Sequence, residues 1–207
     1  MRRLFSRSIT IALFCVCVAA QAQDRMPAME ESEMNEAQLA SVAALVEARG
    51  YGPRGPWVPL LRSPEVMTRA RAMGDYLRYN TSLEPRLSEF LILLTAREWS
   101  QQYEWYAHHD IALEAGINAE TVEAIAAGRR PEGMADDHAI LYALFTELNR
   151  TRQVSDDTYA RAVEMFGERG VIDTVGVIGY YTLLAMAMNT ARTAVPDEDF
   201  PPLPSLP

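Results

Sequence analysis

The chain has 207 residues, of which 49% are hydrophobic and 23% charged, and this composition is ordinary for a globular protein with its own core. Its formal net charge is −9, and it contains no glycine-rich phosphate loop or dinucleotide-binding fingerprint. Because an acidic surface repels phosphate backbones and anionic lipids, the charge excludes a nucleic-acid partner and argues against a membrane partner for the mature protein.

The first 22 residues have the pattern of a secretory signal peptide. Arg2, Arg3 and Arg7 precede an apolar run from Ile9 to Ala20, and Ala20-Gln21-Ala22 forms a small-residue cleavage site. We therefore expect residues 1–22 to be removed and the mature protein to be periplasmic, with an uncleaved membrane anchor as the alternative. Both cysteines of the chain, Cys15 and Cys17, lie in this segment. The mature protein would then form no disulfide and perform no thiol chemistry.

Residues 23–207 are expected to form one domain, with a core over about 36–196, a flexible N-terminal segment and a proline-rich tail. Capping residues mark the ends of several helices; Asn35 and Gly50 bracket the first. No segment shows the sustained alternation of a strand, so the sequence predicts an all-α fold packed as a helical bundle. The expected helices cover residues 36–49, 65–79, 86–99, 101–115, 118–127, 134–151, 156–166 and 171–193.

Apolar spacing predicts which helix faces turn inward. In the helix over 65–79, Met73 is expected to be buried on one face with Met67, Ala70 and Leu77. The last helix is apolar on nearly all sides, and Val175 and Tyr181 are expected to be buried in it. Trp57 is expected to anchor the loop that precedes residue 65. His138 is expected near the surface, at the start of its helix.

Ionisable residues interrupt the apolar stretch from Pro85 to His109. Glu89 lies in the run that continues to Leu94, and Glu104 and His108 are four residues apart, which places them on one face of a helix together with Gln101. If the chain turns between Trp99 and Gln101, two packed helices bring Glu89 against this face. Two carboxylates and an imidazole in a partly dry pocket suit proton transfer near neutral pH.

Two plainer interpretations of the same residues stay open. Glu104 and His108 can form a helix-surface pair worth about 0.2–0.5 kcal/mol, and Glu89 can be paired with Arg86 or Arg97. Perturbed pKa values also arise in such structural ion-pair networks.

The same stretch resembles the carboxymuconolactone decarboxylase and alkylhydroperoxidase D-like superfamily. In the peroxidase branch a Glu is followed by a Cys twelve residues on, a second Cys three later and a His four after that. From Glu89, this pattern falls on Gln101, Glu104 and His108, so that Glu and His match and both cysteines are replaced. The segments RLSEFLILLTAREW and YEWYAHH look like the cysteine-free, decarboxylase-like branch, and the likeness covers most of residues 55–196.

The resemblance implies a homo-oligomeric, cofactor-free carboxy-lyase-like enzyme that decarboxylates or isomerises a small carboxylated lactone or a related enolisable acid. His108 is then the proton donor or base, with Glu89 orienting it and Glu104 as a second acid. We assign the substrate carboxylate to Arg86 or Arg97, and the pocket wall to Gln101 and Trp105. The missing cysteines disfavour a thiol peroxidase.

Three alternatives remain at this point. An isomerase or lactone hydrolase needs the same proton-transfer groups. Glu89, Glu104 and His108 would be a possible metal-binding set, although His109 points about 100° away from His108 on a helix and supplies no further ligand. A non-enzymatic periplasmic protein on the same scaffold is the third.

Overall fold

The computed structural model describes residues 24–205, so the predicted signal peptide lies outside the described part. Within residues 24–205 the chain forms helices and no strand, which confirms the all-α prediction. A short 3-10 helix over Glu31–Glu33 precedes α1 (Glu36–Arg49), α2 (Trp57–Leu60), α3 (Pro64–Tyr79), α4 (Pro85–Glu98), α5 (Gln102–Glu114), α6 (Ala119–Ala126), α7 (Asp136–Thr151) and α8 (Asp156–Ala191).

Local sequence explains most of these boundaries. The side chains of Asn35, Gln101, Asn118 and Ser155 each accept a hydrogen bond from a backbone N–H in the first turn of the helix that follows. Gly50 ends α1 in the left-handed conformation, with a φ of 74°. The short helix α2 was not predicted. It forms within the segment before residue 65, which its glycines and prolines led us to expect as a loop.

The long helix α8 contains a break. Gly167 has φ 68° and ψ 169°, so two helical segments meet there, as the separate predictions over 156–166 and 171–193 require. By length and composition α8 is apolar enough to cross a membrane, but 56% of its most apolar window is buried inside the protein. This burial is what the core helix of a folded domain shows.

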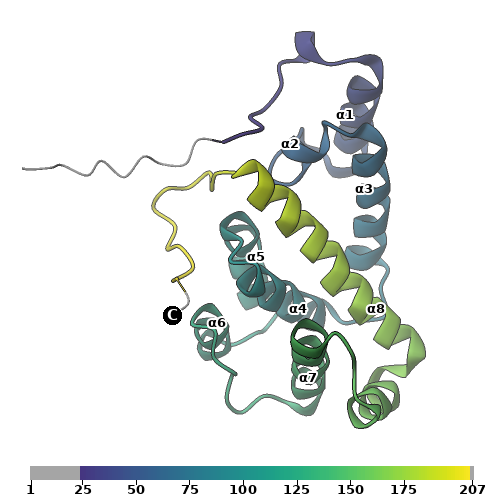
Figure 1. Cartoon of the computed structure of the whole chain (residues 1–207), viewed down its shortest axis with the longest axis vertical. Coiled ribbons are helices and arrows are strands. Elements are labelled where there is room, and N and C mark those ends of the chain that lie inside the picture. The colour runs from purple at the N-terminus through teal and green to yellow at the C-terminus, as the bar shows by residue number, and fades with distance from the viewer. Residues whose placement is uncertain (1–23, 206–207) are drawn as a thin grey trace, which may run out of the picture.

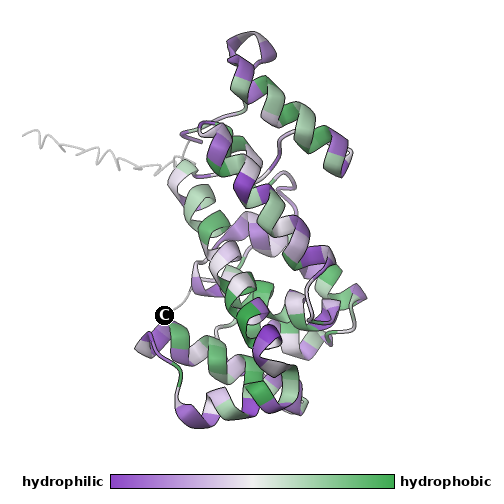
Figure 2. Ribbon diagram, turned by 90° about the vertical axis from the view of Figure 1, so that its right-hand side faces the viewer, coloured by the Kyte–Doolittle hydropathy of each residue, from purple (hydrophilic) through white to green (hydrophobic). Residues whose placement is uncertain are grey.

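The centre of the protein is α4, which packs against α5, α6, α7 and α8. Figure 1 shows α8 running diagonally across the molecule, with α1, α2 and α3 at one end and α6 and α7 at the other. Every residue of α4 from Leu87 to Arg97 is buried. The outer helices carry alternating hydrophobic and hydrophilic segments (Figure 2), as expected for amphipathic helices that cover a core.

Three burial predictions were wrong. Met73 is 44% exposed and Val175 is 42% exposed, whereas His138 is buried against the ring of Phe90. Met73 and Val175 are exposed because α3 and α8 meet through other residues. The two helices approach closely at Gly74, where an added Cβ would lie 2.2 Å from the hydroxyl oxygen of Tyr180. The face of α3 that contains Gly74 is therefore the buried one. Trp57 is buried as predicted.

The C-terminal tail returns over the chain's own surface. From the end of α8 it passes α5 and ends near α6 (Figure 1). The side chain of Gln102 donates to the carbonyl of Leu203 at 3.2 Å and accepts from its N–H at 2.8 Å, while Leu203 itself is buried. Phe200 packs edge-on against Tyr106 at a ring distance of 5.1 Å. The tail is thus part of the fold.

Candidate functional site

The turn between α4 and α5 brings the predicted site residues together. Ser100 adopts a left-handed conformation with a φ of 47°, which is uncommon for a residue other than glycine. Two bonds hold it: Gln101 N–H donates to the carbonyl of Ala96 at 2.8 Å, and the Arg97 guanidinium donates to Ser100 Oγ at 2.7 Å. Because the reversal takes only three residues, α5 packs directly on α4.

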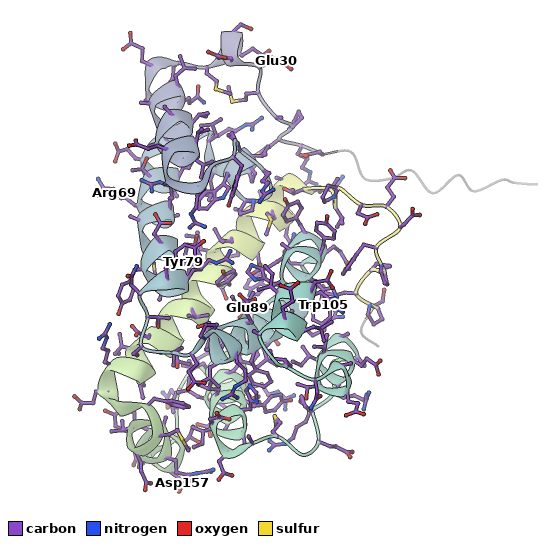
Figure 3. All side chains as sticks on the ribbon, turned by 180° about the vertical axis from the view of Figure 1, so that it is seen from behind. Glu30, Arg69, Tyr79, Glu89, Trp105 and Asp157 are labelled. Atoms are coloured by element: carbon purple, nitrogen blue, oxygen red, sulfur yellow. The ribbon has the colours of Figure 1, made fainter. Side chains whose placement is uncertain are left out.

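Glu89 and His108 meet across this helix pair. The Oε2 atom of Glu89 lies 2.6 Å from Nδ1 of His108, and both residues are only 6% exposed. Figure 3 shows Glu89 near the middle of the molecule, far from the labelled Glu30 and Asp157 at its two ends. The ring of Tyr181, from α8, stands perpendicular to the His108 ring at 5.2 Å. The pair is therefore a buried hydrogen bond between α4 and α5, walled by α8.

Glu104 lies one helical turn before His108 and is 2% exposed. Neither of its carboxyl oxygens has a hydrogen-bond partner among residues 24–205. Burial raises the pKa of Glu104 well above its usual range, because nothing compensates the loss of hydration by the charged form. Burial thus favours the neutral form of the Glu104 carboxyl group.

Gln101 connects α5 to α8. Its Oε1 accepts from the N–H of Glu104 at 3.0 Å, and its Nε2 donates to Oδ1 of Asn189 at 3.1 Å. Asn189 in turn donates to the carbonyl of Trp99 at 2.9 Å. These bonds fix the start of α5 and therefore the position of His108.

A cavity of about 750 Å³ opens beside the pair. Of the three residues predicted to be catalytic, only His108 lies on its wall; Glu89 and Glu104 stand behind that wall. Gly55, with a φ of 55°, lets the loop before α2 approach α5 closely, since a Cβ there would lie 2.4 Å from the Tyr103 ring. Eight aromatic residues contribute to the rest of the wall: Tyr51, Trp57, Tyr79, Tyr103, Tyr106, Tyr180, Tyr181 and Phe200.

Three arginines also line the cavity, and they differ in their contacts. Arg49 forms a 2.6 Å ion pair with Asp75. The Arg54 guanidinium lies 3.8 Å from the centre of the Tyr51 ring. Arg78, from α3, is half-buried and has no hydrogen-bond or ion-pair partner within residues 24–205. The cavity therefore combines an imidazole, aromatic surface and positive charge.

The arginines predicted to hold a substrate carboxylate lie elsewhere. Arg86 donates to Oδ2 of Asp137 at 2.6 Å, at the start of α7. Arg97 donates to the carbonyl oxygens of Ala126 and Pro204, so it ties the tail and α6 to the α4–α5 turn. Neither residue lines the cavity beside His108. Both were predicted from their proximity to Glu89 in the sequence, but their helical positions turn them to other faces of α4.

Trp105 is also outside the cavity wall. It is 4% exposed and packs 5.9 Å from the ring of His109, in the core. His109 bonds to Asp110 at 2.7 Å, away from His108, as the helical angle predicts. Gln101, Trp105 and Arg97 therefore hold the helices around the site in place and do not line the cavity.

Arg78, Tyr180 and Tyr181 line the cavity but were not predicted as site residues. Arg78 is one of three arginines in the amphipathic helix α3, so composition did not single it out. Tyr180 and Tyr181 are adjacent in a long apolar helix, and a tyrosine pair in such a run is a signal that could have been used.

Within residues 24–205, no group of three or more His, Cys, Asp or Glu side chains is arranged to hold a metal ion. That part of the chain also contains no cysteine. The chemistry available at the cavity from its own side chains is proton transfer and anion binding.

Comparisons with known proteins place this arrangement in a recognised fold. No protein-family model and no curated protein matches the sequence. A solved structure of an alkylhydroperoxidase AhpD core, an uncharacterized peroxidase-related protein from Ralstonia eutropha, aligns with a TM-score of 0.67 and 16% identity over 84% of this chain and 93% of that one.

Two further solved structures are similar. A protein of unknown function from Agrobacterium tumefaciens aligns with a TM-score of 0.60 and 15% identity over 67% of this chain and 96% of that chain. A cysteine-to-alanine variant of the debrominase Bmp8, in complex with 2,3,4-tribromopyrrole, aligns with a TM-score of 0.61 and 10% identity over 82% and 90% of the two chains. At these identities the likeness establishes the fold, an AhpD-like helical bundle, and that fold was predicted.

Proposed function

We propose that this chain, which has the fold of the AhpD-like proteins, is an exported, cofactor-free enzyme that decarboxylates or isomerises a small carboxylated lactone or a related enolisable acid. The observation that carries the proposal is the Glu89–His108 pair, which is buried on one side and reaches a cavity on the other. The absence of cysteine from residues 24–205 argues against peroxidase chemistry based on a thiol.

His108 is the group that acts on the substrate. Glu89 accepts the hydrogen bond from Nδ1–H, which leaves Nε2 without a partner among the described residues and free to exchange a proton with a ligand in the cavity. In a decarboxylation, the bond between the carboxylate and its neighbouring carbon breaks and carbon dioxide leaves. The electron pair of that bond moves into the neighbouring carbonyl to give an enolate. Protonated His108 then delivers a proton to carbon.

Glu89 is a positioning residue in this scheme. It selects the tautomer and orientation of the imidazole through the 2.6 Å bond, as a carboxylate does for histidine in other acid–base sites. Burial favours the neutral form of Glu104 on the same helix, so Glu89 is the carboxylate that His108 contacts directly. An imidazolium formed during turnover is therefore stabilised by one carboxylate.

A bound pyrrole in a similar fold is consistent with a small ring as substrate. The debrominase structure holds 2,3,4-tribromopyrrole. Here the aromatic walls of the cavity offer stacking surfaces for a lactone or another planar ring. A cavity of about 750 Å³ also has room for such a molecule and several waters.

The test is a screen of carboxylated lactones and related oxo acids, read by mass spectrometry for loss of carbon dioxide or isomerisation. The purified protein is compared with His108→Gln and with His109→Gln, which changes the neighbouring histidine outside the cavity. We expect turnover by the wild type and the His109 variant, and a loss of about 10²-fold or more in the His108 variant. Ligands that bind but are returned unchanged throughout the screen would contradict the proposal.

Export and self-association belong to the same proposal. The pattern of residues 1–22 supports a periplasmic location. An exposed apolar stripe along α8 supports a homo-oligomer: Ile172, Val175, Leu183 and Met186 are 68%, 42%, 40% and 45% exposed. Light scattering after size exclusion should give a multimer for the wild type and a smaller species for Ile172→Lys.

A further inference from the structure

We propose that Arg78 is the residue that binds the substrate's anionic group, and that the cavity takes a small planar monocarboxylate with its carboxylate at Arg78 and its ring against the aromatic walls. The inference rests on the proposed function for the reaction at His108, and it names the ligand class and the recognition residue.

Arg78 is the half-buried arginine of the cavity wall, and it has no hydrogen-bond or ion-pair partner within residues 24–205. It lines the cavity from α3, its nearest described aromatic partner is the Tyr79 ring, 5.7 Å from the guanidinium carbon, and no carboxylate or carbonyl of residues 24–205 accepts from it. A half-buried guanidinium that donates to no protein group has its N–H donors available to a ligand in the cavity. A ligand carboxylate matches its fork of N–H donors in shape and charge.

The other two arginines on the wall are weaker candidates for binding an anion. Arg49 is held by Asp75 at 2.6 Å, and Asp75 also pairs with Arg71 at 2.9 Å. Arg54 stacks on Tyr51 at 3.8 Å and, unlike Arg78, is exposed, so solvent can satisfy its donors. Arg78 is therefore the strongest candidate for recognising a bound anion.

Arg78 also lies within electrostatic reach of the Glu89–His108 pair. Burial acts to lower the pKa of Arg78, but Tyr181 and Glu89 act in the opposite direction and raise it above its ordinary value, so the cation remains charged. Tyr181 contacts the His108 ring edge-on at 5.2 Å. Arg78 and His108 line the same cavity, so a ligand whose carboxylate binds Arg78 shares that cavity with the imidazole.

The charges of the wall favour a single negative charge on the ligand. Asp110 and Asp197 line the same cavity and repel anions, while Arg49 is neutralised by its ion pair. A carboxylate pairs with Arg78 through one negative charge. A dianion such as phosphate adds a second charge, which Asp110 and Asp197 repel. Ring surface adjoining the carboxylate gains contact with Tyr180 and Tyr181.

The experiment is calorimetric titration of the full-length protein as purified with benzoate, benzamide and inorganic phosphate. Benzoate and benzamide share shape and differ in charge. The variants are Arg78→Gln, Arg78→Lys and Arg69→Gln; Arg69 lies on the same helix with its side chain 80% exposed and points outward (Figure 3). Binding needs no turnover, so a failure here is distinguishable from a failure of the proposed reaction.

We expect the wild type and Arg69→Gln to bind benzoate at least about tenfold more tightly than benzamide, and Arg78→Gln to lose that preference while Arg78→Lys keeps part of it. His108→Gln should still bind benzoate, because the anion is held by Arg78. Equal affinity of Arg78→Gln and wild type for benzoate would overturn the proposal. So would phosphate binding more tightly than benzoate, or no binding of benzoate by a wild-type protein whose circular dichroism shows it folded.

Discussion

The carboxylate of Glu89 and the imidazole of His108 lie 2.6 Å apart although they come from different helices, and both are shielded from solvent except where His108 meets the cavity. The bond depends on the three-residue reversal at Ser100, which sets α5 against α4. A buried pair of this kind is costly to break, because the remaining partner keeps its desolvation penalty.

Glu89→Gln tests whether Glu89 acts through His108. The amide can accept or donate a hydrogen bond, so the imidazole loses its tautomer preference while the packing is kept. We expect kcat to fall by about 10- to 10²-fold with little change in KM, and the nitrogen NMR spectrum of His108 to show a mixture of tautomers. An unchanged tautomer and an unchanged kcat would mean that Glu89 has no positioning role.

Glu104 should be protonated at neutral pH. Burial raises its pKa well above the usual range, so the folded protein keeps this proton where the unfolded chain, with a pKa of about 4.3, has lost it. The folded state then binds more protons, and stability falls as pH rises from that value towards the folded pKa.

The matching variant is Glu104→Gln, which is neutral at every pH. Urea unfolding from acidic to alkaline pH should show that this variant lacks the decline seen in the wild type, and that Glu114→Gln, an exposed change on the same helix, retains it. Infrared spectra at neutral pH should show a protonated carboxylic acid band that Glu104→Gln lacks. If the spectra of the two proteins agree, Glu104 is ionised and the account of its burial is wrong.

The contact between α3 and α8 predicts an unusual effect of a glycine substitution. Alanine normally stabilises a helix relative to glycine by about 1 kcal/mol. Gly74→Ala should instead destabilise the protein by about 1–3 kcal/mol, because the new Cβ would collide with the Tyr180 hydroxyl. Gly179→Ala, in α8, has open space around it and should stabilise. Chemical denaturation of the two variants checks the sign of each change.

The tail should loosen when its attachment to α5 is removed. Gln102→Ala deletes both hydrogen bonds to Leu203 while leaving the helix intact. Hydrogen exchange over residues 197–204 should accelerate, and benzoate affinity should fall because Pro196, Asp197 and Phe200 form part of the cavity wall. Gln153→Ala, an exposed change distant in sequence, is the control. Unchanged exchange would show that the burial of Leu203 and the Arg97–Pro204 hydrogen bond hold the tail without Gln102.

Much of the helix pattern was predictable because it depends on short-range chemistry. Caps such as Asn35 and Asn118, and the apolar spacing of each helix, fix local conformation through bonds within a few residues. The proximity of Glu89 to His108 was also predicted, since it required only one tight turn between two adjacent helices. Gly167 shows the same principle, because the break within α8 falls between two segments predicted separately.

The cavity wall was not predictable in the same way. Arg78 and Tyr181 are brought to His108 by the packing of α3 and α8, which are distant in sequence from α5. The choice between Arg78 and the arginines nearer to Glu89 depended on which faces of α3 and α4 turn inward. The α3–α4 connection is likewise fixed from afar, since Asp173 on α8 accepts hydrogen bonds from Thr81 and Ser82.

The most direct test of the account is turnover in deuterium oxide of the substrate found in the screen, with the product analysed by mass spectrometry. If His108 delivers the proton, the wild-type product carries one deuterium on the carbon adjacent to the carbonyl, and His108→Gln forms that product at least about 10²-fold more slowly. A His108→Gln variant that forms the deuterated product as fast as the wild type would contradict the central claim.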